Sequence, residues 1–153
     1  MSMLLRYILP VAIVIFVLDR VSKVWIVDWL DLKNRLSLDV FPPFLNLRMA
    51  WNTGINFGIG GGGPDETRWV LIGLSVVISA ALLWWVLRRG VRSLALGAGA
   101  VIGGALGNAW DRWEWGAVAD FLNMSCCGIQ NPFSFNIADI AIFMGAVWIA
   151  WKA

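Results

Sequence analysis

Two acidic residues in strongly apolar surroundings are the best candidates for chemistry in this chain. Asp120 lies in an apolar stretch that ends at Phe121, and Asp139 lies at the start of a long hydrophobic run. An ionisable side chain at membrane depth is costly, so its presence indicates a function. Two carboxyl groups held close together cannot both ionise cheaply, and they can then share a proton and act as general acid and general base. The pair therefore predicts hydrolysis in or beside a membrane.

The composition is typical of a membrane protein. Of the 153 residues, 59% are hydrophobic and 14% are charged, whereas soluble domains contain roughly 45–50% apolar and about 25% charged residues. Eleven Trp accompany a single Tyr, and indole side chains favour the membrane–water interface. The chain has no His, which excludes His-based triads and His-ligated metals, and Cys126 and Cys127 are adjacent rather than in a CxxC pattern. We expect no metal, no other cofactor and no nucleic-acid partner.

Four apolar segments predict transmembrane helices. A spanning helix needs roughly 20 apolar residues, and the candidate segments are Leu4–Trp29, Trp69–Leu87, Leu94–Trp110 and Phe135–Trp151. We therefore expect residues 1–153 to form one all-α membrane domain with four transmembrane helices.

Basic residues predict the orientation, because Lys and Arg in short loops favour the cytoplasmic side. They gather in the connection 88–92, with Arg6 near the N-terminus and Lys152 after the last segment. If all four segments span, these places share one side, so both termini are expected in the cytoplasm. Loops 30–68 and 111–134 then lie outside.

The first outer loop, 30–68, has the pattern of a small β-sheet. Stretches 36–41 and 44–51 partly alternate apolar and polar residues, as half-buried strands do, and a proline pair separates them. A glycine-rich turn follows at 58–64. We expect a small extracytoplasmic sheet on the outer membrane surface.

Polar residues within the predicted helices share faces near the outer ends. Asp19 and Lys23 are four residues apart, in the better order for an intrahelical ion pair. The other spacings that place polar residues on one face are Asn108 with Arg112 and Asn136 with Asp139. The sequence therefore predicts one polar cluster at the outer interface, within reach of Asp120.

Some of these residues have a purely structural alternative. Asp19–Lys23 and Asp111–Arg112 would hold helix ends together as ion pairs, since pairing is how charges are tolerated in a bilayer. Asn52, Asn108 and Asn136 serve either as caps and interhelical hydrogen bonds or as support for the acidic pair. The stripe of Gly99, Gly103 and Gly107, at a spacing of four, predicts close helix packing.

Five blocks of the chain together resemble the lipoprotein signal peptidase (signal peptidase II) family. They occur in the family's order and cover most of the chain; they are Asp19–Lys23, Asn52–Gly58, Gly103–Arg112, Val118–Phe121 and Phe135–Asp139. Two departures from the family pattern are Ser22 in place of Thr before Lys23, and Ile55-Asn56 in place of Ala-Ala. The second departure changes the expected shape of that outer loop.

The resemblance implies a bacterial inner-membrane aspartyl endopeptidase of four helices. Such enzymes remove signal peptides from diacylglyceryl-modified prolipoproteins just before the lipidated cysteine, and globomycin inhibits them. The family's catalytic pair corresponds to Asp120 and Asp139. Its supporting residues correspond to Asp19, Lys23, Asn52, Gly54, Asn108, Arg112 and Asn136.

Other readings of the polar residues remain open. A small proton-coupled transporter or proton relay also uses intramembrane acids, but it would need polar groups that continue to the inner side. A non-catalytic assembly subunit would use the polar residues only for helix association. Within the peptidase reading, either aspartate can be the base, because such a pair titrates as a unit. Oxyanion stabilisation can come from Asn52, Arg112 or Asn136.

Overall fold

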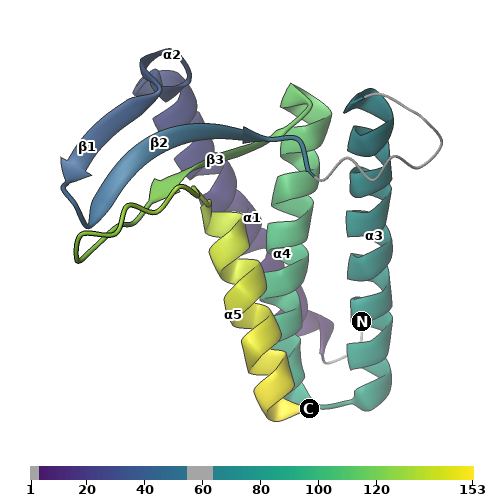
Figure 1. The fold of residues 1–153 in the computed structure, drawn as a ribbon. Helices are drawn as coiled ribbons and strands as arrows, with labels where there is room; N and C mark the ends of the chain where they lie inside the picture. Colours follow the sequence, from purple (N-terminus) through teal and green to yellow (C-terminus); the bar gives the residue numbers. More distant parts are fainter. Residues whose placement is uncertain (1–3, 55–63) are drawn as a thin grey trace.

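The computed structural model describes residues 4–54 and 64–153, and its long helices form a bundle with a small sheet at one end (Figure 1). The described helices are α1 (Leu5–Lys23), continued by a π-helical segment η1 (Val24–Trp29), α2 (Leu32–Arg35), α3 (Pro64–Arg89), α4 (Arg92–Trp115) and α5 (Ile137–Lys152). Each of the four predicted apolar segments forms a long helix. Both Ile55-Asn56 and the glycine-rich stretch 58–63 lie outside the described residues.

Helix α4 is the central element, because α1, α3 and α5 all pack against it. Its glycines allow the close approach: a Cβ on Gly103 would lie 2.5 Å from the carbonyl oxygen of Ala12 in α1. A Cβ on Gly104 would lie 2.6 Å from the carbonyl oxygen of Ala138 in α5. Gly103 and Gly104 therefore allow close packing against two different helices, α1 and α5. The prediction of close packing along Gly99, Gly103 and Gly107 is confirmed, and a second glycine face, turned to α5, was not predicted.

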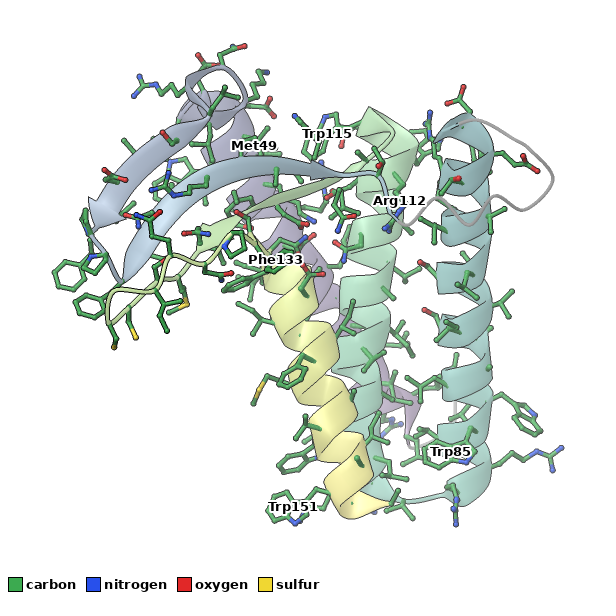
Figure 2. All side chains as sticks on the ribbon, in the orientation of Figure 1. Met49, Trp85, Arg112, Trp115, Phe133 and Trp151 are labelled. Carbon is green, nitrogen blue, oxygen red and sulfur yellow. The ribbon has the colours of Figure 1, made fainter. Side chains whose placement is uncertain are left out.

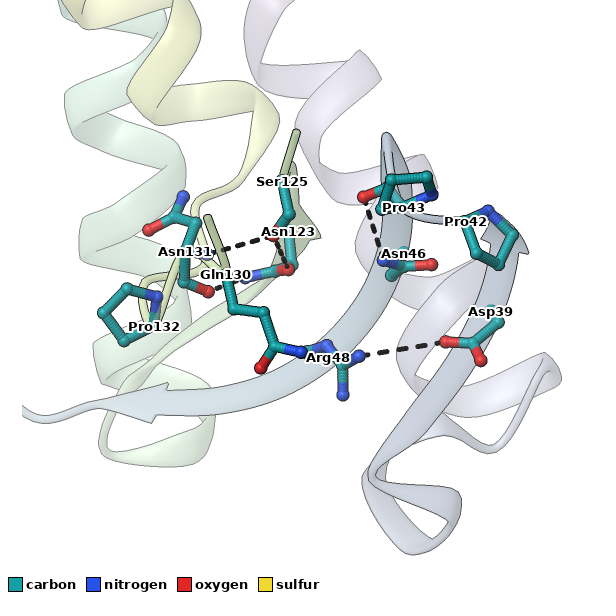
Figure 3. A pocket seen from close by; sticks show the side chains of 10 residues that line it. All are labelled: Asp39, Pro42, Pro43, Asn46, Arg48, Asn123, Ser125, Gln130, Asn131 and Pro132. Carbon is teal, nitrogen blue, oxygen red and sulfur yellow. Dashed lines mark hydrogen bonds and ion pairs between the residues drawn. The ribbon is translucent and has the colours of Figure 1, made fainter. Parts of the chain in front are cut away.

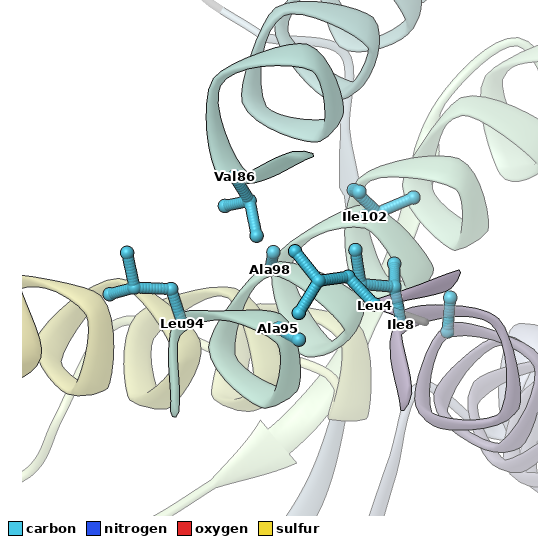
Figure 4. Packing of buried hydrophobic residues seen from close by; sticks show 8 residues of the cluster. Leu4, Ile8, Val86, Leu94, Ala95, Ala98 and Ile102 are labelled. Atoms are coloured by element: carbon cyan, nitrogen blue, oxygen red, sulfur yellow. The ribbon is translucent and has the colours of Figure 1, made fainter. Parts of the chain in front are cut away.

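The end of the bundle away from the sheet is apolar inside and basic outside. Buried Leu4, which precedes α1, and Ile8 of α1 meet Val86 of α3 and the alanines of α4 (Figure 4). At the same end, as Figure 2 shows, lie Trp85 and Trp151. The cations of Arg89 and Lys152 stand over these rings at 5.4 Å and 3.9 Å from the ring centroids.

Two of the described helices, Asp65–Arg89 and Arg92–Trp115, are long and apolar enough to cross a membrane by themselves. Helix α5 has 16 residues, and α1 carries Asp19, Arg20 and Lys23 near its end. The polar content of α1 therefore has to be satisfied inside the protein.

The described strands form one antiparallel sheet in the order β1 (Ser37–Phe41), β2 (Leu45–Asn52) and β3 (Val118–Asn123). The first two strands confirm the prediction for the loop 30–68. The third corrects it, because β3 comes from the second outer loop, where no strand was expected. Five of its six residues are buried, so it lacks the alternation that marks a half-exposed strand. Phe121 of β3 packs with Val27 and Leu32, which anchors the sheet to the end of α1.

Candidate active site

Asp120 lies on β3, directly above the polar ends of α4 and α5, and is 4% exposed. Its Oδ2 accepts a hydrogen bond from Asn52 Nδ2 at 3.1 Å, and its Oδ1 accepts one from Asn136 Nδ2 at 2.7 Å. The orientation of the Asn52 amide is set from its other end, where Oδ1 accepts from the Gly54 N–H at 2.9 Å. Gly54 has a φ of 85°, which favours glycine in this turn. Asn52 and Gly54 were both predicted to support the site. In the structure, Asn52 contacts Asp120 and Gly54 contacts Asn52.

Asp139 lies in the first turn of α5 and is linked to Asp120 through Asn136. Asn136 caps the helix: its side chain accepts from the Asp139 N–H at 2.9 Å, and Asp139 Oδ2 accepts from the Asn136 N–H at 3.3 Å. This reciprocal capping box fixes the position of the carboxylate at the helix start. The same Asn136 also donates to Asp120, so one side chain joins both acidic residues.

Asn108 of α4 provides the next link. Its Nδ2 donates to Asp139 Oδ1 at 2.9 Å. Its Oδ1 accepts from Asn136 Nδ2 at 3.2 Å and from Lys23 Nζ at 3.3 Å. Because Lys23 can only donate, the amide orientation follows from these partners.

Lys23 is fully buried and lies between two buried carboxylates. Its Nζ is 2.7 Å from Asp19 Oδ2 and 2.6 Å from Asp111 Oδ2. The predicted Asp19–Lys23 pair is present, but the predicted Asp111–Arg112 pair is wrong. Asp111 instead contacts Lys23 and Arg20, the latter at 2.7 Å, because adjacent helix residues point in different directions.

The two carboxylates beside Lys23 also hold the backbone next to each candidate catalytic residue. Asp19 accepts from the Ala138 N–H at 3.0 Å, immediately before Asp139. Asp111 accepts from the Ala119 N–H at 3.2 Å, immediately before Asp120. The buried ion cluster therefore positions both acidic residues at once.

Burial and the charge of Asp139 raise the pKa of Asp120 to about 6, against the opposing effect of the Asn52 and Asn136 hydrogen bonds. A carboxyl group with such a pKa can keep or release a proton near neutral pH, as a general acid or base must. Arg112 completes the electrostatics, because its cation interacts with both carboxylates. It donates to the Asn108 carbonyl at 3.3 Å, while its buried Nε has no hydrogen-bond partner.

An apolar groove of about 290 Å³ opens beside Asp139. Its other walls are Phe135, Ile140, Phe143 and Met144. Asp139 is thus part of the lining of a hydrocarbon-like groove. Among residues 4–54 and 64–153, no three His, Cys, Asp or Glu side chains form a group that could hold a metal ion.

Two residues of the network, Asp111 in its present role and Arg20, were not predicted from the sequence. Asp111 is three residues after Asn108, a spacing that places both on one helix face and could have revealed it. No comparable spacing in the sequence indicated a role for Arg20. Its second contact, with Glu114 Oε2 at 2.5 Å, joins residues 94 positions apart in the chain.

Comparisons with known proteins show which family this chain resembles. A family model described as signal peptidase (SPase) II matches residues 11–153. A lipoprotein signal peptidase of Rhodopseudomonas palustris is 40% identical over 144 residues, which cover 92% of this chain and 87% of that protein. One of Caulobacter vibrioides is 40% identical over 136 residues, with 88% and 79% covered.

A solved structure described as a bacterial membrane enzyme, determined by the in meso method at 1.9 Å resolution, superposes with a TM-score of 0.73. It is 25% identical and covers 94% of this chain and 89% of that chain. The chain belongs to the signal peptidase II family and is a peptidase.

The ion cluster yields a stability prediction. Lys23→Met should be destabilising by roughly 3–5 kcal/mol, because it leaves buried Asp19 without its cation and removes one of the two cations that contact Asp111. The matched control is Lys33→Met, which breaks an exposed pair with Asp28 and should cost at most about 1 kcal/mol. Thermal unfolding of the detergent-solubilised proteins measures both.

A double variant tests the shared role of Lys23. In Asp19→Asn/Lys23→Met, the loss should persist, since Asp111 still lacks its contact with Lys23. Recovery of the wild-type melting temperature would show that Lys23 compensates Asp19 alone.

Proposed function

We propose that this protein removes signal peptides from diacylglyceryl-modified prolipoproteins, cleaving just before the lipidated cysteine, with Asp120 and Asp139 as the catalytic pair. The observation that carries the proposal is that Asn136 donates hydrogen bonds to both carboxyl groups, from its side-chain Nδ2 to Asp120 Oδ1 and from its backbone N–H to Asp139 Oδ2. This arrangement suits two carboxyl groups that share a proton. Membership of the signal peptidase II family supports the substrate class.

In the proposed reaction, one carboxylate removes a proton from a water molecule as the water attacks the scissile carbonyl. The other carboxyl group, protonated, donates to the leaving amine. Asn52 and Asn136 already donate to Asp120. Arg112 is therefore the better candidate to stabilise the oxyanion, since its cation interacts with both carboxylates.

We further propose that all four long helices span the bacterial inner membrane, with both termini in the cytoplasm and the site near the outer face. The tryptophans and cations at the sheet-free end would then form the inner interface. Residues 1–153 would act as one membrane domain. The apolar groove beside Asp139 would contact membrane lipid or the lipid-modified substrate.

A proton relay receives no support from the described residues at the other end of the bundle. The cluster there consists of apolar side chains, including Leu4, Ile8 and Val86. A pathway to the inner face would need polar groups at that depth.

The catalytic assignment predicts that Asp120→Asn and Asp139→Asn each lower turnover at least about a hundredfold, because each removes one half of the acid–base pair. Asn is nearly isosteric, so the melting temperature should change little. Asp28→Asn, at an exposed position, is the control and should retain full activity. The measurement is the cleavage of a lipidated prolipoprotein, with globomycin as the expected inhibitor. Near-normal turnover in either variant would remove that residue from the pair.

The raised pKa of Asp120 predicts the pH dependence. The pair needs one proton, so kcat/KM should fall as pH rises above about 6. Asn52→Ala removes a donor that stabilises the Asp120 carboxylate, so the pKa should rise and the fall should move to higher pH. Profiles between about pH 4.5 and 8.5 measure this, with Asn34→Ala as control. A shift to lower pH would contradict the assignment.

The proposed topology predicts which cysteines a membrane-impermeant thiol reagent reaches. Cys126 and Cys127 are exposed and should be labelled from outside in intact cells. In a variant with both replaced by Ser and with Ala153→Cys, labelling should require permeabilised cells. Labelling of position 153 in intact cells would reverse the topology.

A further inference from the structure

A polar cavity of about 480 Å³ lies at the end of the sheet away from α4, between the β1–β2 turn and the loop after β3 (Figure 3). None of the proposed catalytic or supporting residues lines it. Its polar walls come from Asp39, Asn46, Arg48, Asn123, Ser125 and Gln130. Prolines from both sides complete the lining of the cavity.

Two buried asparagines form the floor of this cavity, and one of them has a side-chain acceptor without a hydrogen-bond partner. Asn123, 2% exposed, donates to the carbonyls of Asn131 at 2.8 Å and Phe133 at 2.9 Å. Asn46, 5% exposed, donates to the Pro43 carbonyl at 3.3 Å, while its Oδ1 has no partner. A buried acceptor without a donor is destabilising. Turning the amide round would not help, because two acceptors would then meet at Pro43.

The rim of the cavity is adjustable. Arg48 and Asp39 are 3.9 Å apart, and their side chains are 52% and 63% exposed. Such a loose exposed pair contributes little to stability. Both charges can therefore turn towards a bound molecule.

One loop contributes residues both to this polar cavity and to the apolar groove at Asp139. Residues 130–132 line the polar cavity, and Phe135 lines the groove. The backbone of Phe135 is paired with Leu122 of β3, with N···O distances of 2.8 and 3.0 Å. Successive parts of this segment thus line two chemically different cavities, and Asp139 lies in the lining of the apolar one.

We propose that the polar cavity binds the first residues of the mature chain that follow the lipidated cysteine of the substrate. This inference rests on the proposed function. Asn123 is three positions after Asp120 on β3, about 10 Å away at roughly 3.3 Å per residue. An extended peptide reaches that far with about three residues after the cleavage site. Its backbone would face the polar lining of the cavity, and its polar side chains would meet Asp39 and Arg48.

The test uses two substrates with the same signal peptide and lipidated cysteine. The long one continues into a polar mature segment, and the short one ends in an amide one residue after the cysteine. For the long substrate, Arg48→Ala/Gln130→Ala should lower kcat/KM roughly three- to tenfold, the effect of one or two lost hydrogen bonds. The short substrate should be cleaved equally by wild type and variant. Arg35→Ala, an exposed change on α2, is the matched control.

A variant of the floor gives an independent measure. Asn46→Leu removes a polar side chain from the lining, and it should show the same selective loss for the long substrate. Its melting temperature reports on folding, and the rim variant keeps the test valid if Asn46→Leu does not fold.

Equal losses on both substrates, or none on either, would overturn the inference. Equal losses that change with vesicle headgroup composition would indicate a lipid site instead. If wild type cleaved neither substrate, the proposed function would fail, and this inference with it.

Discussion

The structure depends on one fully buried cation, Lys23, and the two carboxylates that neutralise it. A buried charge is tolerated only when it is well paired and hydrogen-bonded, so α1 and α4 have to meet where Asp19, Lys23 and Asp111 come together. Each carboxylate has capacity left for a backbone N–H, at Ala138 and at Ala119. The need to satisfy these charges therefore positions α5 and β3, and with them the acidic pair.

Packing and polarity divide the bundle into two ends. Glycines let α1 and α5 approach α4 closely, which brings the polar ends of these helices within hydrogen-bonding distance. The other end is filled by apolar side chains. The residues of the candidate active site thereby lie at the end that the sheet covers, where β2 contributes Asn52 and β3 contributes Asp120. Burial beneath this sheet, with the nearby charge of Asp139, raises the pKa of Asp120.

The surroundings of the site change in polarity over a short distance. Within the loop 130–135, the first residues line a cavity with polar walls and Phe135 lines an apolar groove. A lipoprotein precursor changes in the same way at its cleavage site, from an apolar signal peptide to a polar mature chain. An apolar groove close to a polar cavity would position such a substrate, and the enzyme would not need to recognise a long sequence motif.

The sequence by itself determined the long helices and the first two strands, because these depend on local periodicity. It also indicated which polar residues share a helix face. Only the tertiary structure decided that β3 joins the sheet and that Asp111 pairs with Lys23 and Arg20 rather than Arg112. It likewise decided that Asn136 reaches both acidic residues. Strand pairing and ion pairing between helices join residues far apart in the chain, and a buried strand has no alternating pattern to announce it.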